Sequence, residues 1–187
     1  MRDVVDRPWR TVRQVHGSRV VTVDASSDRT GDADALVTTD PSVAIAVRTA
    51  DCPAIALVSD EGVAAVAHAG WRSLVAGVVE ATVDVMRERG ATRIAAALGP
   101  HIGPECYEFS PADIDRVARS YGACVRATSS GGAPALDLGA GVRAALARRG
   151  VALAHDVASC TACDADRWYS HRARREPERL AAVVWLQ

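Results

Sequence analysis

The chain has 187 residues, of which 49% are hydrophobic and 24% charged, a size and composition that suit one globular domain or at most two small ones. Its 22 basic residues balance 23 acidic ones for a formal net charge of -1, so the charge favours neither nucleic acid nor an anionic membrane surface as a partner. No apolar run approaches the ~20 residues of a membrane-spanning helix. The N-terminal residues lack the apolar core of a signal peptide, and we therefore expect a cytoplasmic protein.

Two amino acids are missing: every basic residue is arginine, and the sequence contains neither lysine nor asparagine. A Schiff-base lysine, a P-loop lysine and a Cys-His-Asn triad are therefore excluded. Any cation that the chemistry requires must come from arginine, protonated histidine or a metal. Five cysteines in a chain without a signal peptide favour free thiols over a disulfide scaffold.

The first half of the chain is rich in predicted strands. Apolar and β-branched runs bounded by Gly, Pro or Asp predict strands over residues 19–24, 43–48, 54–58 and 63–67. Apolar residues at helical spacing then predict a helix over 73–89, which Gly90 ends. A strand over 93–98 leads into a Gly-Pro-His-Ile-Gly-Pro loop.

The second half is predicted to alternate helices and strands. Ser110 and Pro111 begin a helix that extends to about residue 120, and a Ser/Gly-rich flexible surface loop follows at 129–134. The pattern then predicts a helix over 137–149 and strands over 151–156 and 180–186. The arginine-rich segment 171–179 is typical of a solvated helix or loop face.

Side chains able to do chemistry gather where predicted strands end. Cys52 joins two apolar strands, and the proline after it favours an extended backbone. His68 follows the strand 63–67, and His16 precedes the first strand; Gly17 permits a tight turn that would present the imidazole outwards. One cysteine and two histidines on separate loops fit a catalytic zinc site, which typically has three protein ligands.

The spacing of these residues leaves other uses open. Cysteine and histidine also occur in protein cores without any ligand. A Cys52 nucleophile with His68 as its base would use the same atoms without a metal. Cys160-Thr161-Ala162-Cys163 could bind metal or act as a redox pair, but a single copy favours two packed thiols. The signature of the zinc nucleoside deaminases is absent.

Five ordered motifs between Gln14 and Arg172 resemble those of a known family. They are Gln14-Val15-His16-Gly17, Thr49-Ala50-Asp51-Cys52-Pro53, His68-Ala69-Gly70-Trp71-Arg72, Gly99-Pro100-x-Ile102-Gly103-Pro104-x-Cys106-Tyr107-Glu108, and Cys160-Thr161 followed by Tyr169-Ser170-His171-Arg172. On these motifs the chain resembles the laccase-domain family, also called YfiH-type. Its members were first labelled polyphenol oxidases and later described as purine nucleoside phosphorylases.

The resemblance implies an α+β fold: a four-layer α/β/β/α sandwich with mixed sheets, formed by a single domain over residues 1–187. It also implies one zinc ion, bound by the residues that match His16, Cys52 and His68. The implied reaction is phosphorolysis of adenosine, inosine, guanosine and methylthioadenosine, with adenosine deamination as a side activity. The expected partners are a purine nucleoside and phosphate, and the expected assembly is a monomer or a small homo-oligomer.

The resemblance also suggests roles for single residues. The expected catalytic residues are Asp51, Cys52 and His68, where Asp51 would orient a zinc-ligating histidine or contact ribose. Arginine binds phosphate bidentately, and the phosphate candidates within the motifs are Arg48, Arg72 and Arg172. The other expected substrate-binding residues are Trp71, Tyr107 and His171.

The sequence departs from the family pattern at three places. The family has a further strand and helix ahead of the first motif, whereas residues 1–13 precede it here, so the resemblance implies an N-terminally shortened domain. Ser73 stands where glycine usually follows the His-Ala-Gly-Trp-Arg motif. Glu105 stands where the first of two adjacent cysteines is common.

Two hypotheses from other classes stay open. A copper phenol oxidase would agree with the older family name, but five histidines are too few for the several His-rich motifs of a multicopper centre. A Cys52 and His68 hydrolase, or a non-catalytic factor in the editing of peptidoglycan precursors, would agree with roles linked to some relatives. Metal content separates the oxidase from the phosphorylase, and phosphate dependence separates the phosphorylase from a hydrolase.

Overall fold

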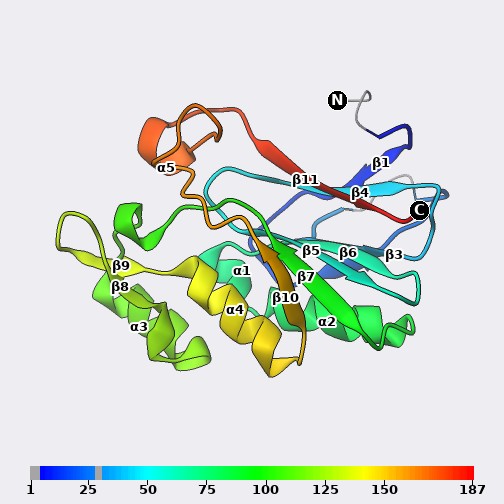
Figure 1. The fold of residues 1–187 in the computed structure, drawn as a ribbon, viewed down its shortest axis with the longest axis horizontal. Coiled ribbons are helices and arrows are strands. Elements are labelled where there is room, and N and C mark those ends of the chain that lie inside the picture. Colours follow the sequence, from blue (N-terminus) through cyan, green and yellow to red (C-terminus); the bar gives the residue numbers. More distant parts are fainter. Residues whose placement is uncertain (1–4, 28–30) are drawn as a thin grey trace.

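The largest sheet of the protein has six strands (Figure 1). The computed structural model describes residues 5–27 and 31–187. In spatial order the strands are β10 (Ala152–Asp156), β7 (Ile94–Leu98), β5 (Ala54–Ser59), β6 (Ala64–His68), β3 (Ala35–Thr38) and β2 (Val20–Thr22). The four inner strands run antiparallel, and each edge strand pairs in parallel with its neighbour. The sheet is therefore mixed.

A three-stranded sheet packs on one face of the six-stranded sheet (Figure 1). Its order is β1 (Trp9–Thr11), β4 (Ala44–Thr49) and β11 (Leu180–Trp185), with β1 parallel and β11 antiparallel to β4. Leu36, Ile45 and Val66 belong to the buried core that joins the two sheets. The segment from β4 to β5 therefore crosses from one sheet to the other, and it carries the Asp-Cys-Pro motif.

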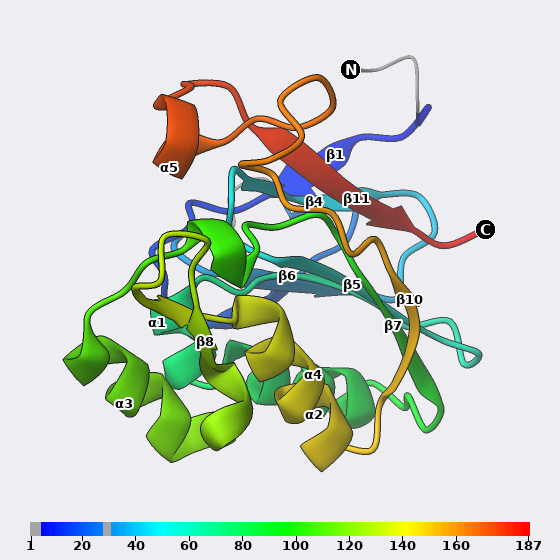
Figure 2. The same ribbon diagram turned by 60° about the vertical axis from the view of Figure 1, so that its left-hand side comes forward.

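Helices cover the opposite face of the six-stranded sheet (Figure 2). They are α1 (Trp71–Val75), α2 (Val78–Glu88), α3 (Pro111–Tyr121) and α4 (Leu138–Arg148). Side-chain caps fix two of the helix starts, because Ser110 accepts a hydrogen bond from the Asp113 N–H and Asp137 accepts one from the Ala140 N–H. The larger of the two hydrophobic cores lies between these helices and the six-stranded sheet. Its buried side chains include Ile55, Leu57, Leu74, Met86 and Leu146.

The remaining elements are short and lie towards one end of the sheets. The single-turn helices η1 (Pro104–Cys106) and η2 (Ala123–Val125) flank α3 in the chain. Strands β8 (Arg126–Thr128) and β9 (Pro134–Leu136) form a hairpin, and α5 (His171–Arg174) lies beside the start of β11 (Figures 1 and 2). None of the described helices is both long enough and apolar enough to cross a lipid bilayer.

The predicted α+β class with mixed sheets is confirmed. Figures 1 and 2 show three of the expected layers within the described residues, in the order helices, six-stranded sheet and three-stranded sheet. The fourth layer, helices over the outer face of the three-stranded sheet, stays a prediction.

The helix predicted over 73–89 is wrong as a single element. The structure has two helices, α1 and α2, separated at Ala76 and Gly77. Gly77 adopts a left-handed conformation with φ of 85°, which breaks the regular run of backbone hydrogen bonds. The apolar periodicity continues across the break because both helices face the same core, so periodicity alone does not reveal it.

Four short strands, β1, β3, β8 and β9, were not predicted. β3 shows no alternation of apolar and polar residues because it is buried on both faces, with Leu36 in one core and Val37 in the other. Part of the segment 129–134, predicted as a flexible loop, forms the turn of the β8–β9 hairpin, where the Ser129 N–H donates to the Ala133 carbonyl over 2.9 Å.

Candidate functional site

The structure brings His16, Cys52 and His68 together. His68 is the last residue of β6, and the β5–β6 register pairs it with Ala54, two positions after Cys52. The candidate donor atoms, one from each of the three side chains, all lie within 4.8 Å of one another. His16 is exposed, Cys52 is partly buried and His68 is buried. The three ligands proposed from the sequence can therefore bind one metal ion.

A fourth residue, Asp34, holds both histidines in place. Its carboxylate is fully buried, and Oδ1 lies 2.9 Å from His68 Nδ1. Strand β3 pairs antiparallel with β6, matching Ala35 to Ala67, so Asp34 stands opposite His68. Because Nδ1 is held by the carboxylate, Nε2 of His68 is left to face a ligand. The expectation that Asp51 orients a zinc-ligating histidine is therefore wrong for His68, since this role belongs to Asp34.

Asp34 also shapes the turn that carries His16. Its oxygens accept hydrogen bonds from three successive backbone N–H groups, those of Val15, His16 and Gly17, over 3.2, 3.0 and 2.7 Å. His16 itself takes a positive φ of 59°, a conformation in which non-glycine residues occur mainly at functional sites. The expected tight turn is present, but His16 and not Gly17 takes the left-handed conformation, because the Asp34 carboxylate binds the three backbone N–H groups of the turn.

Gly70 leaves room for two of the candidate ligands. A Cβ at this position would lie 2.8 Å from His16 Cδ2 and 3.1 Å from Cys52 Sγ. Its backbone, with φ of -59°, is one that any residue can adopt, so space and not backbone strain requires glycine here.

We expect Gly70→Ala to weaken metal binding at this site by at least roughly tenfold, the smallest loss typical of disturbing residues around a metal. The added methyl group would displace His16 from Cys52. Competition for zinc with a chromophoric chelator measures the loss. Gly17→Ala is the matched control, because its Cβ would meet Asp34 Oδ2 at an ordinary 3.7 Å. Equal zinc affinity in both variants would contradict the steric argument.

The electrostatics of the site favour a thiolate. Burial raises the pKa of Cys52, but hydrogen bonds and charge from His16 and His68 outweigh burial and lower this pKa to about 7. Burial lowers the pKa of His68, whereas Asp34 and Cys52 together raise it to about 9. Near neutral pH Cys52 is therefore substantially a thiolate, the form that binds metals and attacks electrophiles.

Asp51 lies next to Cys52 in the chain but is directed towards the C-terminal segments. Its Oδ1 accepts hydrogen bonds from Thr161 Oγ1 and Ser170 Oγ over 2.7 and 2.6 Å, and its Oδ2 accepts one from the Arg172 N–H over 2.6 Å. Its backbone takes a positive φ of 85°. Asp51 thus positions the segment that carries two expected substrate-binding residues, His171 and Arg172.

Two guanidinium groups stack on an aromatic wall formed by Trp71, Tyr107 and Phe109. The Arg72 guanidinium lies 4.4 Å above the Trp71 ring, and the Arg172 guanidinium 4.5 Å above the Tyr107 ring. Phe109, which the sequence analysis missed, contacts both rings, at centroid distances of 5.4 Å to Trp71 and 5.0 Å to Tyr107. The sequence signal for Phe109 was its position next to the Cys-Tyr-Glu motif.

The charges around Tyr107 link this wall to Cys52, one of the three candidate metal ligands. Burial, together with the negative charges of Cys52 and Asp51, raises the pKa of Tyr107 to about 12, whereas Arg172 and Arg72 oppose the increase. Two expected phosphate ligands and the candidate thiolate therefore act on the same buried ring.

A pocket of about 620 Å³ opens above the metal ligands. His16, Cys52 and His68 line it, together with Arg48 and His171, both of which are exposed. Gln14 fixes the backbone of Arg48 by a pair of hydrogen bonds, of 2.8 Å to its carbonyl and 2.9 Å from its N–H. Arg13 and Arg179, which the sequence analysis did not single out, add further positive charge to the lining.

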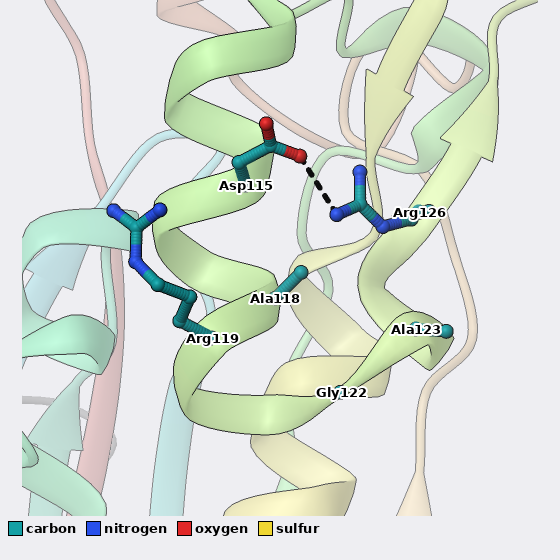
Figure 3. A pocket seen from close by; sticks show the side chains of 6 residues that line it. All are labelled: Asp115, Ala118, Arg119, Gly122, Ala123 and Arg126. Carbon is teal, nitrogen blue, oxygen red and sulfur yellow. Dashed lines mark hydrogen bonds and ion pairs between the residues drawn. The ribbon is translucent and has the colours of Figure 1, made fainter.

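Another hollow, of about 440 Å³, lies between α3 and the turn that follows it (Figure 3). Its charged side chains are Asp115, Arg119 and Arg126, and Arg126 donates to Asp115 over 2.7 Å. The residues that line it include no cysteine or histidine. This hollow therefore offers neither a thiol nor an imidazole.

Relatives with named activities match most of the chain. A purine nucleoside phosphorylase of Streptomyces coelicolor is 44% identical over 96% of this chain and 76% of its own length. An adenosine deaminase from an unknown prokaryotic organism is 36% identical over 86% of this chain and 68% of its own length.

A solved structure and a family model give the same assignment. The crystal structure of the Neisseria meningitidis protein NMB0706 superposes with a TM-score of 0.88 at 30% identity, covering 99% of this chain and 77% of that one. The family model described as multi-copper polyphenol oxidoreductase laccase matches residues 2–187. The five motifs, the fold and these matches agree, and the chain belongs to this laccase-like family, the one that includes the YfiH-type proteins.

Proposed function

We propose that the protein is a zinc-dependent purine nucleoside phosphorylase acting on adenosine, inosine, guanosine or methylthioadenosine, with adenosine deamination as a side activity. The observation that carries the proposal is the convergence of His16, Cys52 and His68 at the base of a pocket whose lining also contains Arg48. The names of the related phosphorylase and deaminase support the choice of nucleosides as substrates.

The donor set fits zinc. Two imidazoles and one thiolate are ligands that zinc prefers, and three protein ligands are typical of a catalytic site. The Asp34 carboxylate behind His68 is the kind of outer partner that fixes a ligating histidine. A zinc ion bound there would supply Lewis acidity towards charge that develops on the purine and would make bound water more acidic. A multicopper centre would need more histidines than these residues provide.

The chain's own residues would bind and orient the two substrates. Arg48, Arg72 and Arg172 present guanidinium groups that can hold a phosphate dianion bidentately, in line with the anomeric carbon of the ribose. In phosphorolysis a phosphate oxygen forms a bond to that carbon while the bond to the purine nitrogen breaks. The partly exposed ring of Trp71 offers a flat apolar surface on which a purine can stack, whereas the buried ring of Tyr107 supports the guanidinium of Arg172.

The experiment that tests the reaction is incubation of the zinc-loaded protein with adenosine or inosine, with and without phosphate. We expect free base and ribose 1-phosphate only when phosphate is present. Equal release of base without phosphate would identify a hydrolase. No turnover of adenosine or inosine, nor of guanosine or methylthioadenosine assayed in the same way, would reject the proposal.

One observation favours a second candidate, a metal-independent hydrolase. Cys52, His68 and Asp34 form a nucleophile, a base and an orienting carboxylate, the arrangement of a catalytic triad. Removal of metal with a chelator distinguishes the two functions. The proposed phosphorylase loses its activity, whereas a cysteine hydrolase would keep its activity and would be inactivated by a thiol alkylating agent.

We expect Arg72→Ala to lower phosphorolysis by about one to two powers of ten, because a charge-assisted contact is worth roughly 1.5–3 kcal/mol. The loss is expected chiefly in the KM for phosphate. Deamination needs no phosphate and is expected to change less. Arg119→Ala, which removes an exposed arginine from the hollow of Figure 3, is the control. Equal loss of both activities would show that Arg72 does not act through phosphate.

A further inference from the structure

A second group of candidate metal ligands lies outside the pocket that contains His16, Cys52 and His68. Glu105 and Cys106 belong to η1, whereas Cys160 and Cys163 belong to a turn more than fifty residues later. One donor atom from each of the four side chains lies within 4.8 Å of the others. The sequence alone favoured two packed thiols at Cys160 and Cys163, and the fold adds a third thiol and a carboxylate.

We propose that Glu105, Cys106, Cys160 and Cys163 form a second, structural metal site that binds Zn²⁺ through three thiolates and one carboxylate. Four protein ligands are the number that closes a structural zinc site, whereas a catalytic site has three. Thiolates select zinc over hard cations such as magnesium and calcium. The inference does not rest on the proposed nucleoside chemistry.

The distances agree with tetrahedral coordination. With Zn–S bonds of about 2.3 Å, two sulfurs on one zinc ion lie about 3.8 Å apart, and a sulfur and a carboxylate oxygen lie about 3.6 Å apart. Cys106 Sγ and Cys163 Sγ are separated by 3.4 Å, and Cys163 Sγ and Glu105 Oε1 by 3.7 Å. All three cysteines are free thiols, so binding zinc requires a small expansion of the group and no broken bond.

The backbone is arranged to hold these donors inwards. The Glu105 carboxylate folds back against Gly103, where a Cβ would collide with both of its oxygens. The Gly103 N–H donates to Cys160 Sγ over 3.2 Å, a contact that stabilises negative charge on sulfur. Backbone hydrogen bonds from the His101 N–H to Ser159 and from the Thr161 N–H to His101 hold the two segments side by side.

Charge and access also suit a bound cation. Three thiolates and a carboxylate supply more than the charge needed to balance Zn²⁺. Arg174, which is paired with Glu176 over 3.0 Å, donates to the carbonyls of Ala162 and Thr161 over 3.1 and 3.3 Å and so holds the turn between the two cysteines. A pocket of about 180 Å³ reaches Glu105 and Cys160 from the surface, and Cys163 is exposed. Metal can therefore enter this site from solvent, independently of the nucleoside pocket.

The position of the group gives the metal a structural role. Cys106 precedes Tyr107 of the aromatic wall, and Cys160 precedes Thr161, which donates to Asp51. A zinc ion at this point would therefore tie the segment that leads into the aromatic wall to the segment that anchors Asp51.

Zinc content and cobalt spectra of the full chain test the proposal. After reduction and zinc loading, we expect two zinc ions per chain in the wild type, one in Cys163→Ser, one in Cys52→Ala and none in the double variant. Cobalt bound to Cys52→Ala should show intense thiolate-to-cobalt charge-transfer absorption, which is lost in the double variant. Cys124→Ser is the control, because Cys124 is exposed and donates to the Tyr121 carbonyl.

A second pair of variants keeps all three thiols and so guards against misfolding of Cys163→Ser. Glu105→Gln should weaken zinc binding at this site by at least roughly tenfold, since even changes outside the ligand shell often cost that much, and Glu105→Cys should restore it. Unchanged zinc content in Cys163→Ser would overturn the proposal. Mass spectrometry after zinc loading without reductant gives another check. A mass lower by two hydrogens, as a Cys106–Cys163 disulfide would produce, would also overturn the proposal.

Discussion

Replacing Cys52 with alanine is expected to abolish nucleoside turnover and to lower the zinc content by one ion per chain. Cys52 supplies the only anionic donor among the three candidate ligands of the proposed nucleoside pocket, and its pKa of about 7 keeps much of it deprotonated at neutral pH without metal. Two imidazoles alone hold zinc far more weakly than the complete set of ligands. Elemental analysis together with a phosphorolysis assay measures both losses.

Cys124→Ala is the matched control, because it removes a cysteine that lies outside both groups of ligands. Its zinc content and turnover should equal those of the wild type. Unchanged zinc content in Cys52→Ala would show that the ligand set is wrong. Loss of several copper ions in place of zinc would favour an oxidase of the kind for which the family is named.

Asp34→Asn is expected to have the largest effect on stability. Oδ2 accepts hydrogen bonds from the N–H groups of Val15 and Gly17, while Oδ1 faces His16 and His68. The amide oxygen of an asparagine can accept the hydrogen bonds of one oxygen of Asp34. Its NH₂ group then replaces the other oxygen and faces two donors, with which it cannot form hydrogen bonds. The free energy of unfolding should fall by about 3 kcal/mol or more, the sum of two charge-assisted hydrogen bonds at roughly 1.5–3 kcal/mol each.

Zinc binding should fall with stability in this variant, because the same carboxylate orients His68 and shapes the turn of His16. Denaturant unfolding of the metal-free and zinc-loaded protein separates the two effects. Asp32→Asn is the control: its side chain is 42% exposed and pairs with Arg13, and exposed pairs of this kind contribute about 1 kcal/mol or less. Similar losses in the two variants would refute the role given to Asp34.

The proximity of His16, Cys52 and His68 could be suspected from the sequence because each stands beside a predicted strand, with glycine or proline within two residues. The residues that hold these side chains in place could not be predicted. Asp34 reaches His68 because β3 pairs with β6, and β3 lacks the alternation of apolar and polar residues that identifies a strand in a sequence. Asp51 was noticed for its position beside Cys52, but its partners, Thr161, Ser170 and Arg172, follow from packing of distant segments.

The two groups of cysteines show the same limit. Cys160 and Cys163 form a pattern that is visible in the sequence, yet the sequence does not indicate that Glu105 and Cys106 lie beside them. Parallel pairing of β7 with β10 brings the segments after these strands to the same end of the sheet. Such parallel neighbours are separated by a long connection, here two helices and a hairpin, and local patterns carry no information about it.

The hydrogen bonds of Asp51 also determine when, during biosynthesis, the segment that contains Ser170 and Arg172 can take its place. They join residues that are 110 to 121 positions apart, and closing loops of that length costs about 4 kcal/mol in chain entropy. His16, Asp34, Cys52 and His68 all leave the ribosome before this closure becomes available. A nascent chain thus exposes the candidate zinc ligands before Arg172 can reach Asp51, and a chain released before residue 172 would have these residues without the segment that Asp51 positions.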